Sequence, residues 1–289
     1  MTTSTTLPGG TRALGDLRVT RFGYGAMQLA GPGVMGPPRD RDGALAVLRA
    51  AVDLGITHID TSGAYGPGVV NTLIREALHP YGSDLRIATK VGARRDADGG
   101  WPVSREPADL RRQVEEDLVA LGRDALDVVD LRMGDASGPQ PGSLAEPFAA
   151  LVDMRREGSI REVGLSNVTA DQVAEARAIA PIACVQNMYN LATRHDDALI
   201  DALAADGIAY VPFFPLGGFT PLQSDALSSV AARLDATPMA VALAWLLQRS
   251  PAILLIPGTS SAAHLRENVE GAGLALSAED VEELDAIGA

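Results

Sequence analysis

The chain has 289 residues, of which 46% are hydrophobic, and its 37 acidic and 24 basic residues give a formal net charge of −13. That charge argues against nucleic acid as a partner, because a phosphate backbone would be repelled. No apolar run reaches the roughly 18 residues needed to cross a membrane, and residues 1–10 lack the apolar core of a signal peptide. We therefore expect a cytoplasmic enzyme with a flexible lead over residues 1–10 and a sizeable core.

Short apolar segments alternate with amphipathic segments along the chain. Residues 11–14 and 17–21 flank a Gly-Asp turn and predict an N-terminal hairpin. Further strands are predicted at 22–27, 56–59, 85–90, 127–132, 160–166, 182–186, 209–213 and 252–256. Helices are predicted at 42–54, 69–78, 106–121, 144–157, after Thr169, and at 196–205, 224–234, 238–247, 262–269 and 278–287. Ser104 suits the N-cap of the third helix, and the long polar segment before it suggests a wall over a site.

Eight strand–helix units of this length predict a single (β/α)₈ barrel over residues 11–289, with the N-terminal hairpin and an extra C-terminal helix added to it. The strands are apolar on both faces, as parallel strands covered by helices must be. In such a barrel the carboxyl ends of the strands form the active-site face. The residues at those ends are Asp60, Lys90, Arg132, Ser166, Asn167, Gln186, Phe213, Pro257 and Gly258.

Asp60, Tyr65 and Lys90 bring an acid, a phenol and an amine to one edge of the predicted sheet. A lysine beside a phenol favours the tyrosinate and makes the phenol a stronger acid. A carboxylate beside that lysine keeps it charged and in place. The tyrosine could then donate a proton to a developing alkoxide near neutral pH. The alternative is a salt bridge at the rim beside a packing tyrosine.

Several ordered motifs resemble those of the aldo-keto reductase superfamily. They are Asp60-Thr61-Ser62-Gly63-Ala64-Tyr65-Gly66, Thr89-Lys90, Gly164-Leu165-Ser166-Asn167, and Gln186-Asn187 with Tyr189-Asn190. The resemblance implies NAD(P)H-dependent reduction of a carbonyl without a metal, with Tyr65 as proton donor, Lys90 as its partner and Asp60 paired with Lys90. The segments 65–67, 73–78, 90–95 and 256–261 are similar to the pyridoxal reductase (pyridoxine 4-dehydrogenase) branch, which suggests pyridoxal as a substrate.

Arg132 departs from the family pattern, because most of the superfamily has histidine at the end of this strand. Arginine stays protonated at working pH and cannot act as an acid or base. It could stabilise negative charge on the carbonyl oxygen or hold an anionic substituent such as a phenolate or phosphate. The alternative is a rim arginine bonded to a loop carboxylate such as Asp135.

The cofactor site is predicted at the neighbouring strand ends. Ser166, Asn167 and Gln186 could bond a nicotinamide carboxamide, which is both donor and acceptor. Leu216-Gly217-Gly218 offers backbone N–H groups to a pyrophosphate, and by resemblance the ring of Phe213 stacks on the nicotinamide. The remaining residues that the resemblance implies for this site are Gly25, Met27, Pro215, Pro257, Gly258, Thr259, Ser260, Ser261, His264, Glu267 and Asn268.

NADPH is favoured over NADH by the resemblance alone. Gly258 and His264 stand where the family often has lysine and arginine, so two cations for a 2′-phosphate are missing or weakened. Thr259, Ser260, Ser261 and Arg266 could supply donors beside the N-terminus of the last barrel helix.

No cluster of histidine, cysteine and acidic residues has metal-ligand spacing, so no metal is expected. Cys184 is the only cysteine, which excludes a disulfide within the chain. It lies in an apolar strand, where a buried cysteine usually behaves as a small hydrophobe rather than a nucleophile.

Two other interpretations stay open. Lys90 could form a Schiff base with a carbonyl substrate, as in an aldolase, although Asp60 would keep it charged. The chain could instead be a non-catalytic NADP-binding subunit that senses redox state for a partner. The sequence leaves the physiological carbonyl compound, the favoured direction and the oligomeric state open.

Overall fold

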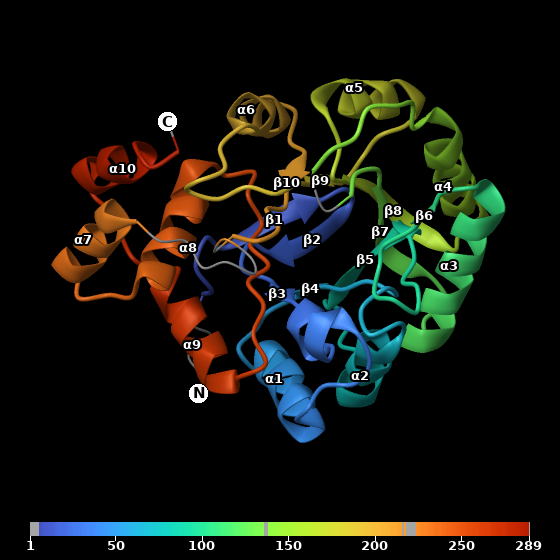
Figure 1. Ribbon diagram of the computed structural model, residues 1–289, viewed down its shortest axis with the longest axis horizontal. Coiled ribbons are helices and arrows are strands. Elements are labelled where there is room, and N and C mark those ends of the chain that lie inside the picture. The colour runs from blue at the N-terminus through green and yellow to red at the C-terminus, as the bar shows by residue number, and fades with distance from the viewer. Residues whose placement is uncertain (1–5, 136–137, 216, 218–223, 289) are drawn as a thin grey trace.

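Short parallel strands form a ring at the centre of the computed structural model, which describes residues 6–135, 138–215, 217 and 224–288 (Figure 1). Neighbouring strands follow the order β10-β9-β8-β7-β5-β4-β3. Their bounds are β3 Tyr24–Gly25, β4 His58–Asp60, β5 Arg86–Ala93, β7 Leu126–Arg132, β8 Ile160–Ser166, β9 Cys184–Gln186 and β10 Ala209–Tyr210.

The segment 252–258 closes this ring between its two edges. Leu254 N donates to Tyr210 O at 2.9 Å on the β10 side, and Gly23 N donates to Leu255 O at 2.8 Å on the β3 side. A parallel bridge between Gly25 and Gly258 continues this pairing to the carboxyl end. The segment therefore takes the place of the eighth strand, and the predicted (β/α)₈ barrel is confirmed.

Helices surround the ring, and most lie where the sequence predicts them. They are α1 Arg41–Asp53, α2 Val69–Leu78, α3 Pro107–Leu121, α4 Ala145–Glu157, α5 Ala170–Ile179, α6 Asp197–Ala205, α7 Asp225–Arg233, α8 Pro238–Arg249, α9 Ala262–Gly271 and α10 Ala278–Asp285, with the short 3₁₀ turns η1 Met27–Leu29 and η2 Pro32–Val34. Thr169 begins α5 with a complete capping box, which satisfies backbone donors that the helix leaves free. Helices α7 and α10 lie outside α8, away from the barrel (Figure 1).

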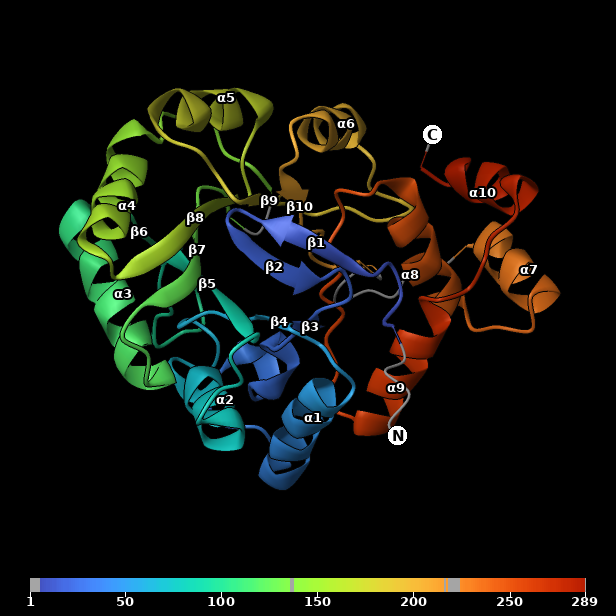
Figure 2. The ribbon, with the colours of Figure 1, turned by 180° about the vertical axis from the view of Figure 1, so that it is seen from behind.

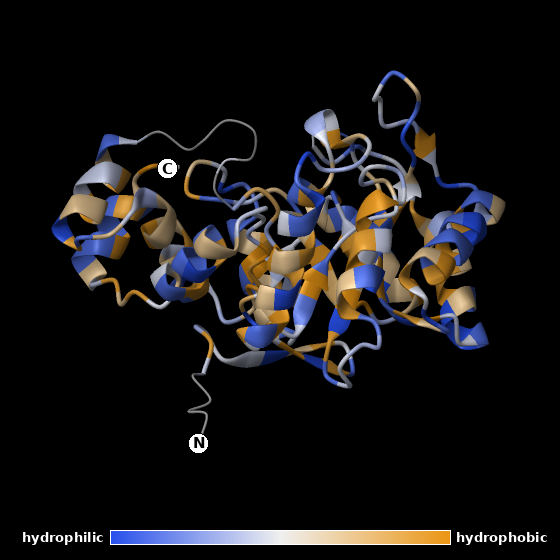
Figure 3. Cartoon of the chain, turned by 90° about the horizontal axis from the view of Figure 1, so that it is seen from below, coloured by the Kyte–Doolittle hydropathy of each residue, from blue (hydrophilic) through white to orange (hydrophobic). Residues whose placement is uncertain are grey.

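Hydrophobic residues gather in the middle of the molecule, and the outer turns of the helices carry hydrophilic ones (Figure 3). The largest side chains that are fully buried include Trp245, Tyr24, Tyr189, Tyr210 and Phe22. Such a core fixes the barrel strands, so that side chains at their ends are held in place.

The N-terminal hairpin, β1 Thr11–Leu14 and β2 Leu17–Thr20, lies across one end of the barrel (Figure 2). Leu14 and Val19 are buried and pack with Ala88 and Val128 from the barrel strands. Because the hairpin covers the amino ends of the strands, only the carboxyl ends are left to form a site.

One local prediction was wrong. Ser104 does not cap the third helix; it lies in β6 Val103–Ser104, which pairs with Gly92 of β5 in an antiparallel arrangement. Helix α3 instead begins after Glu106, whose side chain makes no capping hydrogen bond. The long polar segment is therefore the loop of a β5–β6 hairpin. Ser104 pairs with Gly92 in this hairpin and is not available to cap the helix.

Among the described residues, no single helix is long and apolar enough to cross a membrane, and only α7 and α8 taken together, bent by 93° at their break, pass that test.

Candidate functional site

Asp60 and Lys90 form a buried ion pair at the carboxyl ends of β4 and β5. Lys90 Nζ donates to Asp60 Oδ1 at 2.6 Å and to Thr61 O at 2.9 Å. Burial by itself lowers the pKa of Lys90, but the charge of Asp60, helped by Tyr65, outweighs it, so that the pKa is raised above its usual value. Lys90 therefore stays charged at any working pH.

Tyr65 lies directly above this pair, on the turn that follows β4. Lys90 Nζ is 5.3 Å from the centroid of the Tyr65 ring, and Tyr65 is buried. Gly66 has a φ of 63°, and its N donates to Val34 O at 3.1 Å, which ties the turn to η2. A Cβ at Gly66 would come within 2.6 Å of Gly36 O, so only glycine fits this turn. The fold thus brings Asp60, Tyr65 and Lys90 together.

Two amide side chains at the next strand ends have oxygen atoms that find no partner within the described part of the chain. Gln186 Nε2 donates to Asp60 Oδ2 at 2.8 Å, and Asn167 Nδ2 donates to Asp135 O at 2.7 Å. Gln186 Oε1 and Asn167 Oδ1 are buried and accept no hydrogen bond from the described residues. Asn167 has a φ of 58°, a conformation often found at functional sites. Buried acceptors without donors are costly in a protein alone, so both oxygens are suited to a ligand that donates.

A cleft joins Asp60, Tyr65 and Gln186 to the β3 side of the barrel, and Asn167 is not among its lining residues. A second pocket is lined by Gly63, Lys90 and Arg95, among others. The lining of the first cleft includes the predicted residues Asp60, Tyr65, Gln186, Gly25, Met27, Phe213, Pro215, Pro257 and Gly258. Gln28, Phe214 and Ile256 also line it, and the sequence analysis missed them. Each is the immediate neighbour of a predicted residue, which is the signal that could have found them. Ser166 is buried at its strand end and is not among the lining residues.

The other predicted cofactor residues lie at the start of α9, outside the lining of this cleft. The Ser261 side chain caps the helix by accepting from His264 N. Tyr24 OH donates to Thr259 O at 2.6 Å, which holds this segment against β3. Ser260, His264 and Glu267 are exposed, whereas Thr259 and Asn268 are buried. Gly217 is half-buried, with its N bonded to Phe214 O, and the predicted residues Leu216 and Gly218 lie outside the described residues.

Arg132 ends β7 beside the indole of Trp101. Its guanidinium carbon is 5.2 Å from the ring centroid, and Arg95 lies over the same indole at 4.1 Å. Arg95 Nη2 also donates to Gly33 O at 2.7 Å, which links the β5–β6 hairpin to η2. The Arg132 guanidinium forms no hydrogen bond or ion pair with the described residues. It is therefore held at the barrel mouth by its contact with an aromatic ring.

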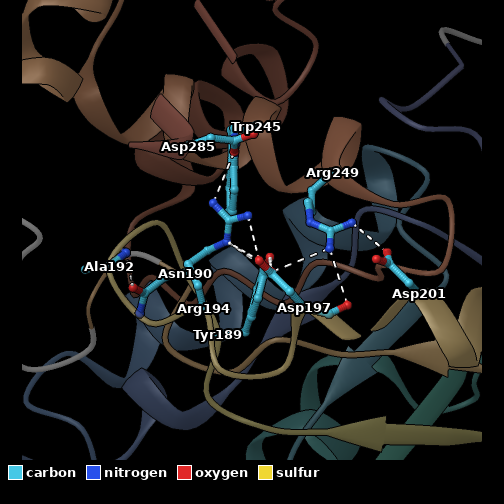
Figure 4. A network of polar contacts seen from close by, with 9 residues as sticks. All are labelled: Tyr189, Asn190, Ala192, Arg194, Asp197, Asp201, Trp245, Arg249 and Asp285. Atoms are coloured by element: carbon cyan, nitrogen blue, oxygen red, sulfur yellow. Dashed lines mark hydrogen bonds and ion pairs between the residues drawn. The ribbon is translucent and has the colours of Figure 1, made fainter. Parts of the chain in front are cut away.

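A network of charged side chains supports the loop after β9 (Figure 4). Tyr189 OH donates to Asp197, which also accepts from Arg194, and Arg194 reaches Asp285 near the end of α10. In the same loop Asn190 Nδ2 donates to Phe214 O at 3.1 Å. The network thereby anchors the segment that supports one wall of the cleft.

No group of three or more histidine, cysteine or acidic residues in the described part of the chain could hold a metal ion.

Comparison with known proteins gives matches over nearly the whole chain. The model of the aldo/keto reductase family matches residues 21–289. Pyridoxine 4-dehydrogenase of Escherichia coli (strain K12) is 63% identical over 279 residues, which cover 96% of this chain and 98% of that protein.

Solved structures give the same picture. A thermostable aldo-keto reductase in complex with the inhibitor epalrestat superposes with a TM-score of 0.80 at 29% identity, covering 94% of this chain and 97% of its own. An aldo/keto reductase from Klebsiella pneumoniae in complex with NADP and acetate has a TM-score of 0.77 at 25% identity, covering 98% and 95%. Sequence and fold therefore agree over almost the full length of each relative.

Proposed function

Because the chain belongs to the aldo/keto reductase family, we propose that it reduces an aldehyde or ketone to an alcohol with NADPH, that Tyr65 donates the proton, and that pyridoxal is a substrate. The chain is an NAD(P)H-dependent oxidoreductase. Pyridoxal is proposed on the strength of the 63% identity to the Escherichia coli pyridoxine 4-dehydrogenase.

The observation that carries the proposal is the position of the Lys90 ammonium group beneath Tyr65. The two lie 5.3 Å apart, measured to the ring centroid, and both side chains are buried. A fixed positive charge there stabilises the tyrosinate that is left once the phenol has given its proton away. Asp60 holds the ammonium group in place at 2.6 Å. A positioned proton donor of this kind contributes roughly 10²–10⁴-fold to a rate.

The residues of the cleft fit a nicotinamide cofactor. Gln186 Oε1, in the cleft, and Asn167 Oδ1, at the neighbouring strand end, accept no hydrogen bond from the described residues, and the N–H₂ of a carboxamide could satisfy them. The half-buried ring of Phe213 supplies an apolar wall, and Gly25 and Gly258 let the backbone approach closely. When bound, the cofactor supplies the hydride for the carbonyl carbon.

The N-terminus of α9 and the residues before it are the proposed site for a 2′-phosphate. The exposed Ser260, with Thr259 and Ser261, provides hydroxyl groups at a helix N-terminus, where anions are favoured. His264 and Arg266 are exposed on the first turns of the helix. Only these two side chains of α9 can carry positive charge, so the preference for NADPH over NADH is expected to be modest.

Arg132 is proposed to act on the substrate. Its guanidinium forms no hydrogen bond or ion pair with the described residues, so it can donate to a carbonyl oxygen or to an anionic substituent. Either function suits a protonated arginine, which cannot itself transfer the proton.

The test is the variant Tyr65→Phe, assayed with pyridoxal and with simple aldehydes by the absorbance of the nicotinamide. We expect turnover to fall at least about 100-fold, while the Kd for NADPH, measured by fluorescence titration, stays within about twofold of the parent, since the hydroxyl is the only group removed. Equal turnover in variant and parent would remove Tyr65 from the mechanism.

The same assay separates the rival interpretations. A parent chain that binds NADPH but turns over no aldehyde would be a binding subunit. A parent that is inactivated by borohydride together with substrate at Lys90 would be an aldolase. The engagement of Lys90 Nζ with Asp60 and Thr61 O argues against the aldolase, because a Schiff base requires a neutral amine.

A further inference from the structure

A second carboxyl group, that of Asp130, lies inside the barrel next to the Asp60–Lys90 pair. Asp130 is in register with Lys90 on β5 and with Gly164 on β8, and it is fully buried. The hydrogen bonds of Lys90 go to Asp60 and Thr61 instead. Burying a carboxyl group without its own cation is costly, so an acid at this position requires a reason other than packing.

Both donors that reach Asp130 come from β9. Cys184 Sγ is 3.3 Å from Oδ1, and Gln186 Nε2 is 3.5 Å from Oδ2. The same Nε2 atom donates to Asp60 Oδ2 at 2.8 Å. The Gln186 amide nitrogen therefore faces two carboxyl groups, one at normal hydrogen-bond length and one at long range.

This arrangement fixes which end of the amide faces inward. The reversed amide would place Oε1 against Asp60 Oδ2, acceptor against acceptor. With the nitrogen inward, Oε1 must point away from both acids, and it has no partner among the described residues. Gln186 lines the cleft, so the free oxygen is available to a ligand there.

The barrel makes room for the Asp130 carboxyl group. A Cβ added to Gly164 would come within 2.1 Å of Asp130 Oδ1 and 2.7 Å of Cys184 Sγ. Both atoms would have to shift, because real contacts of a Cβ are longer. A glycine on β8 thus leaves the space in which Asp130 meets β9.

We infer that Asp130 is a positioning residue for cofactor binding: together with Asp60 it orients the Gln186 amide, so that Oε1 faces the cleft and accepts a hydrogen bond from the carboxamide of a nicotinamide. The inference rests on the proposed function, since it requires the cofactor to bind in this cleft. It assigns Asp130 no contact with the cofactor and no step in the chemistry.

The charge state of Asp130 makes this orientation dependent on pH. Burial raises the pKa of Asp130 to about 7, with Lys90 opposing and Asp60 adding to the effect. The other groups that act on it are Cys184 on β9 and Arg132 on its own strand. An ionised carboxylate accepts from the amide more strongly than the neutral acid, so Asp130 orients Gln186 better as the pH rises through 7.

The test is NADPH binding to the full chain, measured by fluorescence titration from pH 6 to pH 8 in the parent and in Asp130→Asn. The asparagine does not titrate, and its neutral oxygen accepts from the amide more weakly than an ionised carboxylate does. We expect the ratio of the two Kd values, variant over parent, to be near one at pH 6 and about tenfold at pH 8, the effect of one lost hydrogen bond. Taking the ratio removes the titration of the cofactor's own phosphates.

Three further measurements make the result decisive. In a Gln186→Met background, Asp130→Asn should have no further effect, because the two residues act as one unit. Cys184→Ala removes the other donor to Asp130. The Kd of this variant divided by that of the parent should stay near one at both pH values. If Asp130→Asn does not fold, Gln186→Met is compared with the parent instead, and the ratio of their Kd values, variant over parent, should rise from pH 6 to pH 8.

A ratio that does not change with pH, or an undiminished effect in the Gln186→Met background, would overturn the inference and leave Asp130 structural. A parent that binds no NADPH at all would overturn the proposed function instead, so the two failures are distinguishable.

Discussion

Asp117 offers a measurement of how strongly this fold acts on a buried acid. It lies on α3, beneath the turn that carries Tyr65, and its carboxylate accepts from Thr89 Oγ1 at 2.6 Å and from Asn71 Nδ2 at 2.8 Å. A Cβ at Gly63 would come within 2.4 Å of Oδ1, so the turn sits directly on this group. Burial raises the pKa of Asp117 to about 7 in spite of the two hydrogen bonds.

The sign of the effect on stability follows from linkage. Aspartate in the unfolded chain has a pKa of about 3.9, so between that value and 7 the native state binds more protons than the unfolded state. Stability must then fall as the pH rises. At pH 8 the difference of about three pKa units means that Asp117 destabilises the native state by about 4 kcal/mol relative to low pH. At pH 5, where ionisation is favoured only in the unfolded chain, this destabilisation is about 1.5 kcal/mol.

We therefore predict that Asp117→Asn gains about 2.5 kcal/mol of unfolding free energy relative to the parent between pH 5 and pH 8. The asparagine can still accept from Asn71 and can donate to the Thr89 hydroxyl group. The assay is urea unfolding followed by circular dichroism at both pH values. Asp130 and His58 also have shifted pKa values, but their contributions cancel in the difference between variant and parent.

The control is Asp98→Asn, which removes one carboxylate from an exposed position and should change the two stabilities by less than about 0.5 kcal/mol. If the difference between Asp117→Asn and the parent is the same at pH 5 and pH 8, Asp117 does not titrate in this range. The argument from burial would then be refuted for this site.

Two more substitutions test the polar groups at the barrel mouth. Lys90→Met should lower turnover at least about 100-fold and reduce the unfolding free energy by about 3–5 kcal/mol, since it leaves Asp60 buried without its cation; normal turnover by a folded variant would contradict the first expectation, and an unchanged urea midpoint the second. Arg132→Met should lower kcat/KM about 100-fold. An equal loss for benzaldehyde and 4-carboxybenzaldehyde would indicate that Arg132 acts on the carbonyl oxygen, whereas a loss confined to 4-carboxybenzaldehyde would indicate an anionic subsite. No loss with either substrate would make Arg132 structural.

The sequence predicts the arrangement of Asp60, Tyr65 and Lys90 because the register of a parallel barrel leaves little choice. Strand ends from neighbouring units must meet at one rim, and β-branched runs mark where each strand stops. The cleft could be predicted for the same reason, since Gly25 and Gly258 belong to segments that close the ring and are bridged directly.

The sequence does not reveal what happens inside the ring. Asp130 lies in a mostly apolar strand and Asp117 in a helix rich in charged residues. The groups that shift their pKa values come from other elements, and Asp60, which acts on Asp130, lies 70 positions before it in the chain. The one signal for Asp130 was its spacing of two from Arg132, which places both on the same face of β7. Ser104 failed as a cap for a related reason: local propensity favoured the helix, but pairing with β5 took precedence.

The charges in the barrel also decide how the Arg132→Met result is to be interpreted. Asp60 and Asp130 are two acids, and Lys90 and Arg132 are the cations near them, so the four charges balance when Asp130 is ionised. Arg132 contributes to lowering the pKa of Asp130, so its removal must raise that pKa further. An effect that reaches the cofactor through Asp130 and Gln186 will therefore change with pH above 7. A direct contact of Arg132 with substrate will not, because arginine stays protonated throughout this range. Measuring Arg132→Met at two pH values thus distinguishes a direct contact of Arg132 with substrate from its electrostatic effect on Asp130.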